Sequence, residues 1–170
     1  MILFSVGKDR PGIVDDVSTL LFERGANIED SRMAAMGGRF SIMTLFSCPT
    51  EQLEDIKADL DDLGKKGLET SLHEAEDPMA SPAKPALPMK FGVMSMDHPG
   101  VVQKIVHLLH QNNVNIRTLN TQVTRAPLSG APLFDLILEA DVPVEKPIPR
   151  LKNDLMELAA QMNLDLSFRK

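Results

Sequence analysis

Two four-residue segments of this chain combine residue types that can hold a small anion. They are Asp9-Arg10-Pro11-Gly12 and Asp97-His98-Pro99-Gly100, and each precedes apolar residues at helical spacing. Proline is favoured in the first turn of a helix, where the backbone amides have no partner within the helix. The aspartate can accept hydrogen bonds from these amides, and the glycine has no side chain to block a ligand. Each segment therefore predicts either a simple helix cap or a site for a ligand carboxylate.

The two segments belong to a longer internal repeat. The second lies 88 positions after the first, and the same spacing relates further pairs, namely Val17/Ile105, Asn27/Asn115 and Ile28/Ile116. The spacing becomes 94 at Phe40/Phe134, because the second copy has a longer loop at 126–132. A repeat of this kind predicts two copies of one fold, with a function that could lie between the copies.

The hydrophobic period changes in the same order in both copies. The first copy reads strand, helix, strand, strand, helix and strand over residues 2–6, 13–21, 27–35, 40–47, 53–63 and 68–75. The second copy reads the same way over 89–95, 101–112, 115–125, 133–140, 151–161 and 164–168. We therefore predict an α+β protein of two ferredoxin-like βαββαβ domains, each a four-stranded antiparallel sheet with both helices on one face.

A proline-rich segment separates the copies. Residues 77–88 hold four prolines, which favour an extended linker. We predict a first domain over 1–76 and a second over 89–170. Domains of about 80 residues are small enough to gain from packing against another surface, and their sheets leave edge strands that can pair. We therefore expect a homodimer or sheets joined edge to edge, which would bring the two Asp-x-Pro-Gly turns near a common interface.

Charge and cysteine content exclude several classes of function. The 170 residues have a formal net charge of −6, and no sizeable Lys/Arg cluster is present, so we expect no direct binding to nucleic acid. The single Cys48 can form no disulfide within the chain. No leader or membrane-spanning run is visible, so we expect a cytoplasmic protein that does not enter a membrane.

The repeated residues resemble the ACT domain, a regulatory module that binds small molecules. The resemblance rests on 9–14, the helix after it and Asn27-Ile28, and again on 97–102 with Asn115-Ile116. A tandem pair with a long second hairpin is similar to the glycine cleavage system transcriptional repressor group. The resemblance implies an amino acid held at an interface between two modules, by the turn before the first helix and the start of the second strand.

Carried over to this chain, the resemblance nominates ligand-binding residues in both copies. In the first copy they are Asp9, Arg10, Pro11, Gly12, Ile13, Asn27 and Ile28. In the second copy they are Asp97, His98, Pro99, Gly100, Val101, Asn115 and Ile116. The copies differ at Arg10/His98 and Asp30/Thr118, so they need not bind equally well.

Other residues offer little chemistry. His107 and His110 could share a metal on one helix, but no third ligand is in evidence, and a solvated helix face is the simpler interpretation. Cys48 has no histidine beside it in the sequence, which favours an inert thiol over a nucleophile. We therefore expect no catalytic residue, no metal and no cofactor.

The sequence thus predicts a regulator rather than an enzyme. It would bind an amino acid, with glycine the first candidate, and act through a protein partner, which in the repressor group is a transcription activator. Two alternatives remain open. One is a detached regulatory subunit of an amino-acid biosynthetic enzyme, and the other is a small enzyme with a site in a sheet cleft, although no convergent titratable groups support the latter.

Overall fold

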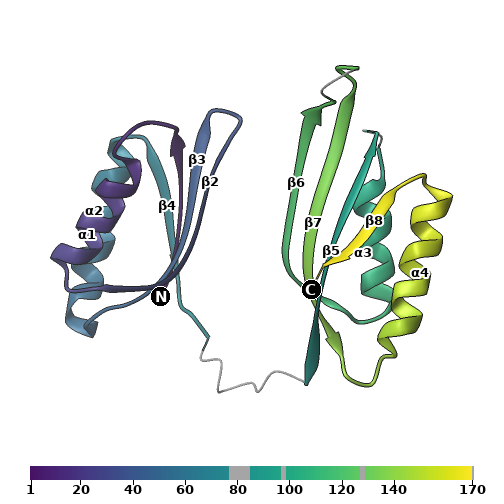
Figure 1. Cartoon of the computed structure of the whole chain (residues 1–170). Coiled ribbons are helices and arrows are strands. Elements are labelled where there is room, and N and C mark those ends of the chain that lie inside the picture. Colours follow the sequence, from purple (N-terminus) through teal and green to yellow (C-terminus); the bar gives the residue numbers. More distant parts are fainter. Residues whose placement is uncertain (77–84, 97–98, 127–128, 170) are drawn as a thin grey trace. The chain divides into compact units, whose positions relative to one another are not determined.

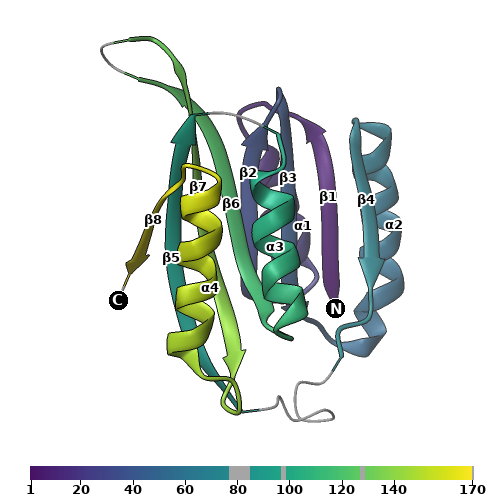
Figure 2. The ribbon, with the colours of Figure 1, turned by 90° about the vertical axis from the view of Figure 1, so that its right-hand side faces the viewer.

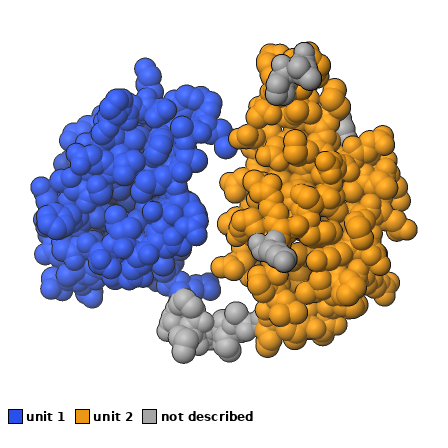
Figure 3. All heavy atoms as spheres, viewed as in Figure 1, with its two compact units in different colours: residues 1–81 blue, residues 82–170 orange. Residues whose placement is uncertain are grey.

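The chain folds as two compact units, residues 1–81 and 82–170 (Figure 3). The computed structural model describes residues 1–76, 85–96, 99–126 and 129–169. Each unit has its own sheet, its own pair of long helices and its own hydrophobic core (Figures 1 and 2).

The first unit is a βαββαβ module with sheet order β2-β3-β1-β4 and antiparallel pairing throughout. Its helices α1 and α2 cover one face of the sheet and leave the other open (Figure 1). Its elements are β1 (Ile2–Lys8), α1 (Ile13–Glu23), β2 (Asn27–Met36), β3 (Arg39–Ser47), the short 3₁₀ helix η1 (Thr50–Gln52), α2 (Leu53–Lys65) and β4 (Leu68–His73).

The second unit repeats this arrangement, with sheet order β6-β7-β5-β8. Its elements are β5 (Ala86–Met96), α3 (Val101–Gln111), β6 (Asn115–Arg125), β7 (Pro132–Pro143), α4 (Ile148–Gln161) and β8 (Asp165–Arg169). Both helices again lie on one face (Figure 2). The predicted α+β class and βαββαβ order are confirmed in both units.

Strand alternation separates a buried face from an open face in each sheet. In the first unit Leu3 and Ile42 point toward the helices, where they meet Leu21 of α1 and Ile56 of α2. In the second unit Phe91 and Leu138 pack in the same way against Leu109 and Leu155. Burial of these apolar faces holds each helix pair to its sheet.

The two cores share their apolar character but differ in their buried hydroxyl groups. Ser5 and Thr44 of the first unit are 4% and 0% exposed, and neither hydroxyl has a hydrogen-bond partner. The equivalent residues of the second unit are Val93 and Leu138, which are fully apolar and equally buried. Among the described residues the second unit has one such hydroxyl, that of Ser95. A buried hydroxyl without a partner costs free energy, so the first unit, with two, bears the larger cost.

The linker that we predicted over 77–88 needs a correction at its end. Residues 77–84 lie outside the described residues, but Ala86, Leu87 and Pro88 belong to β5 and pair with β7. Pro88 is tolerated there because β8 pairs with β5 only from Lys90 onward, which leaves one side of β5 without a neighbour at this end. The second module therefore begins before residue 89.

Candidate functional site

Helix α1 begins without a side-chain cap. Its N-cap residue is Gly12, with φ 85° and ψ −3°, and within the described part of the chain no side chain accepts a hydrogen bond from the first-turn amides. Of the two alternatives that the sequence left open, a cap by Asp9 is not what the structure shows, and Pro11 lies ahead of the first helical residue. The left-handed Gly12 turns the chain just before the helix, so Asp9 lies three residues ahead of the N-cap, and its own N–H donates to the Gly38 carbonyl at 3.1 Å.

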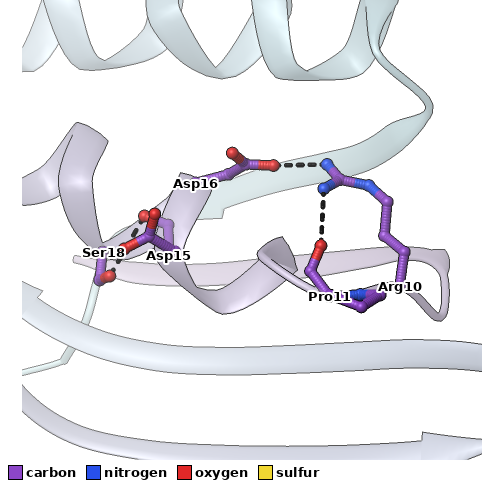
Figure 4. Close-up of polar contacts among 5 residues, drawn as sticks. All are labelled: Arg10, Pro11, Asp15, Asp16 and Ser18. Atoms are coloured by element: carbon purple, nitrogen blue, oxygen red, sulfur yellow. Dashed lines mark hydrogen bonds and ion pairs between the residues drawn. The ribbon is translucent and has the colours of Figure 1, made fainter.

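A guanidinium group lies beside this uncapped helix start (Figure 4). Arg10 Nη1 donates to the Pro11 carbonyl at 3.3 Å, and Nη2 forms an ion pair with the Asp16 carboxylate. Arg10 Nη1 also lies 3.8 Å from the place that a Cβ on Gly12 would occupy. Arg10 would attract an anion to the helix start, whereas Asp15 and Asp16 in the first turn of α1 would repel it.

The equivalent helix start in the second unit has the opposite electrostatic bias. Gly100 is the N-cap of α3 with φ 95°, no described side chain caps the helix, and the space around a Cβ on Gly100 is open to 4 Å. The first turn of α3 holds no acidic residue, and Lys104 replaces Asp16. Asp97 and His98, which we predicted to bind ligand, lie outside the described residues.

The second part of the predicted site lies at the far end of each helix. Asn27 and Asn115 are the first residues of β2 and β6, and both side chains are exposed. Helix α1 has 11 residues and is therefore about 16 Å long. Because β2 begins after the end of α1, the structure does not bring Gly12 and Asn27 of one unit together. Gly100 and Asn115 are separated in the same way by α3.

A feature that we did not predict follows each of these asparagines. The pairing of β2 with β3 shifts register between Ile28 and Asp30, and that of β6 with β7 shifts between Ile116 and Thr118. Both strand starts therefore carry a bulge at the same place, which bends the strand and redirects the next side chains. The sequence carries no local signal for it, because neither Glu29 nor Arg117 is a glycine.

An ion pair follows the first bulge. The Arg32 guanidinium bonds to Asp30, and together with the Ser31 amide it holds the pKa of Asp30 below its ordinary value. Both side chains are 60% exposed, so solvent screens the pair and its contribution to stability is small. Thr118 and Asn120 take these positions in the second unit.

The other residues considered for chemistry have ordinary surroundings. The His107 ring lies 3.0 Å from the Gln111 side-chain amide on the same exposed helix face. No group of three His, Cys, Asp or Glu side chains that could hold a metal occurs within the described residues. Cys48 is half-buried against the core of the first unit. No helix in the described part of the chain is long and apolar enough to cross a membrane.

The fold is a tandem pair of βαββαβ units with equivalent helix starts, and known proteins share it. The ACT domain model matches residues 1–73. The first unit therefore matches the ACT domain family, and the second unit repeats its strand order. A UPF0237 protein of Clostridium acetobutylicum is 36% identical over 67 residues, which cover 38% of this chain and 75% of that protein.

Both units together resemble one particular kind of protein. The glycine cleavage system transcriptional repressor of Escherichia coli (strain K12) is 24% identical over 165 residues, which cover 96% of this chain and 85% of the repressor. An unknown protein from Galdieria sulphuraria has a solved structure with a TM-score of 0.83 and 27% identity, covering 99% of this chain and 95% of that one. A structure assigned provisionally to the same repressors has a TM-score of 0.70 and 24% identity, covering 99% and 94%, and it supports the fold.

Proposed function

We propose that this protein is an amino-acid-binding regulator of the glycine cleavage repressor type, which acts through a protein partner in the cytoplasm. The observation that carries the proposal is the similarity to that repressor over 96% of this chain and 85% of the relative, so that the match includes both modules. Glycine is the first candidate ligand. The acidic balance of the chain, with 24 Asp and Glu against 18 Lys and Arg, favours a protein partner such as a transcription activator over direct contact with DNA.

The uncapped helix starts support a carboxylate ligand. Amides at the N-terminus of a helix attract anions because of their free N–H groups and the helix dipole. Gly12 and Gly100 leave these amides approachable, and no described side chain accepts a hydrogen bond from them at the start of α1 or α3. The first turn of α3, with Lys104 and no acid, is the more favourable of the two for a carboxylate.

The separation of the predicted residues within one unit bears on how a ligand would act. A small amino acid cannot contact Gly12 and Asn27 of the same unit, because α1 lies between them. We propose that the turn and the strand start of two different modules share the ligand, from one chain or from a homodimer. Such a ligand would favour the paired arrangement of modules and so change the surface offered to the partner.

The test is a calorimetric titration of the purified full chain with a panel of amino acids, glycine first. We expect saturable binding of one or a few amino acids and none of their decarboxylated amines, because the carboxylate is the group that the helix start recognises. Equal binding of an amino acid and its amine would contradict the carboxylate site. No binding across the panel would contradict the ligand proposal.

The partner is tested by affinity purification from cells with and without the ligand. Recovery of a DNA-binding protein in a ligand-dependent amount is the expected result. Recovery of a biosynthetic enzyme instead would favour the alternative, a detached regulatory subunit.

Substitutions at Gly12 or Gly100 are poor probes of ligand binding, because a side chain at a φ of 85° or 95° strains the backbone whether or not ligand is bound.

A further inference from the structure

The open face of the first sheet carries a hollow beside an ion pair. This is the face that α1 and α2 do not cover (Figure 1). The hollow has a volume of about 120 Å³ and draws its lining from the neighbouring strands β1, β2 and β3. Its lining residues are Ile2, Asp30, Ser31, Arg32, Met43 and Leu45. We name this feature the sheet hollow.

One part of the sheet hollow is apolar. Ile2 is opposite Leu45 in the register of β1 and β3, and Met43 follows two residues before Leu45 on the same face. Met43 is 41% exposed, so the hollow is open to solvent. A volume of this size has room for about four water molecules, or for one small aliphatic side chain. An aliphatic group that enters the hollow is removed from water, which favours its binding.

The bulge of β2 places two charged residues at the edge of this apolar part. Ile28 is opposite the core residue Phe46, and the next paired residue, Asp30, is opposite Leu45 on the open face. The extra residue at the bulge shifts the alternation of the strand by one. Asp30 and Arg32 therefore lie on the open face, whereas an unbroken alternation would turn both toward the helices.

Both charged side chains keep hydrogen-bonding atoms that are not used within the unit. Asp30 Oδ1 accepts from the Ser31 amide at 2.8 Å and from Arg32 Nη1, and Nη1 also donates to the Ser31 carbonyl at 2.8 Å. Within the described part of the chain, no group bonds to Asp30 Oδ2 or to Arg32 Nη2 and Nε. The ion pair thus offers a ligand one free carboxylate oxygen next to free guanidinium N–H groups.

The second unit does not repeat this combination. It keeps the bulge, but the uncharged residues Thr118 and Asn120 take the places of the charged pair. Lys90 and Glu139 take the places of two apolar lining residues, and their side chains form an ion pair with each other. An apolar hollow beside a free acceptor and a free donor is therefore a property of the first sheet and not of the fold.

We propose that the sheet hollow binds a free amino acid with a small aliphatic side chain, such as valine, leucine or isoleucine. The α-ammonium group donates to Asp30 Oδ2, the α-carboxylate accepts from Arg32 Nη2 or Nε, and the side chain fills the apolar part. A residue inside a polypeptide has neither an α-ammonium nor an α-carboxylate, so the site selects a free amino acid over a segment of a protein. The inference goes beyond the proposed function, because neither helix start takes part and glycine has no side chain to fill the hollow.

The first test varies the ligand. Calorimetric titration of the full chain compares leucine, isoleucine and valine with N-acetyl-leucine, which lacks the ammonium group, and with leucinamide, which lacks the carboxylate. We expect at least one of the three amino acids to bind, and both derivatives of leucine to bind about tenfold or more weakly than leucine. A derivative that binds as tightly as leucine overturns the proposal, as does a failure of all three amino acids to bind at up to about 10 mM.

The second test varies the protein. Arg32→Gln and Asp30→Asn each remove one charge of the site, and each should raise the dissociation constant of leucine about tenfold or more. Arg39→Gln is the matched control, because Arg39 lies on the same face but pairs with Glu69 at 2.9 Å and does not line the hollow. Circular dichroism confirms that the variants fold. A control that weakens leucine binding as much as Arg32→Gln contradicts the site.

A third measurement locates the ligand. Nuclear magnetic resonance resolves the methionine methyl groups, and Met43 lines the sheet hollow while Met94, which is 49% exposed, belongs to β5 of the second unit. Leucine should shift the Met43 methyl signal and leave that of Met94 unchanged. Leucine that binds without moving the Met43 signal lies elsewhere, which overturns the proposal. Glycine titrated into the same samples reports on the helix starts, so a failure of the sheet hollow and a failure of the proposed function give different results.

Discussion

The two units of this chain agree in their cores and differ on their surfaces. Leu21 of α1 and Leu109 of α3 are both fully buried at equivalent positions, and the sheets have the same strand order. By contrast, residues 1–81, with eight Lys and Arg and sixteen Asp and Glu, have a net charge of −8, while residues 82–170, with ten Lys and Arg and eight Asp and Glu, have +2. Packing restricts the core positions to apolar side chains that fit, whereas an exposed position is restricted only by what it touches.

The groove between the two helices also differs in charge between the units. In the first unit it is lined by Asp16, Glu23 and Asp62, among others. In the second unit the equivalent residues are Lys104, Gln111 and Glu157. The apolar floor is retained, with Leu20 and Leu108 at the same position. The same groove is thus strongly acidic in the first unit and mixed in charge in the second.

The largest expected effect is a loss of stability, and it comes from core residues that the two units share. Leu21→Ala and Leu109→Ala each remove a fully buried side chain, and each should destabilise its own unit by about 2–5 kcal/mol. Hydrogen exchange followed by mass spectrometry resolves the two units in one experiment. If only one substitution is costly, the two cores are not equivalent in the sense argued above.

A smaller effect should come from the hydroxyl without a partner. Thr44→Val keeps the shape of the side chain and removes a buried oxygen that has no hydrogen bond, so the first unit should gain about 1 kcal/mol in its free energy of unfolding. The reverse change at the equivalent position, Leu138→Thr, should destabilise the second unit. Denaturant unfolding measures both, and a loss of stability in Thr44→Val would mean that the hydroxyl is satisfied in solution.

The charge at the two helix starts can be exchanged. Lys104→Glu should weaken amino-acid binding by the second module about two- to fivefold, which corresponds to about 0.3–1 kcal/mol. Asp16→Lys should strengthen binding by the first module, because it removes a repulsive carboxylate and releases Arg10 from its ion pair. Gln111→Glu, at the opposite end of α3, is the matched control and should leave binding unchanged. Calorimetry that finds the control as damaging as Lys104→Glu would rule out a site at the helix start.

The smallest effect expected is a dependence on pH that belongs to the second unit. The hydrogen bond and charge of Lys90 lower the pKa of Glu139 below its ordinary value. A carboxyl with a lowered pKa in the folded state stabilises the protein above its unfolded pKa, and this contribution is lost as the pH falls below about 4. Leu45 occupies this position in the first unit. Glu139→Gln should therefore reduce the pH dependence of unfolding of the second unit, and an unaltered dependence would show that Lys90 has no such influence in solution.

The sequence predicted the fold well because the hydrophobic period of its strands and that of its helices are easy to tell apart. Strand and helix order followed from the repeat, and the expected ranges differ from the observed elements mainly at their ends. The open faces were harder to assign. Residues 2–6 are apolar at almost every position, so alternation alone does not say whether Leu3 or Phe4 faces the helices, and only the packing of α1 and α2 decides.

The candidate site was predicted in part. The two Asp-x-Pro-Gly segments do precede helices, but the sequence does not reveal that a left-handed glycine ends each turn and moves the helix start beyond the reach of Asp9. The ion pair of Arg10 with Asp16 depends on the same turn, which brings two residues six apart close together, so the sequence does not reveal it either. The choice between ligand site and plain helix start still rests on the titration proposed above.

The placement of the terminal strands makes resistance to a pulling force depend on the end at which the chain is pulled. In each unit the first strand is central and the last is an edge strand, and β8 has only five residues, all paired with β5 alone. A pulling force applied at the C-terminal end, as by an unfolding motor of a protease, would peel β8 away one hydrogen bond at a time. A force applied at the N-terminal end would have to draw β1 out from between β3 and β4 with both ladders loaded at once. This protein should therefore be unravelled with less force from its C-terminal end than from its N-terminal end.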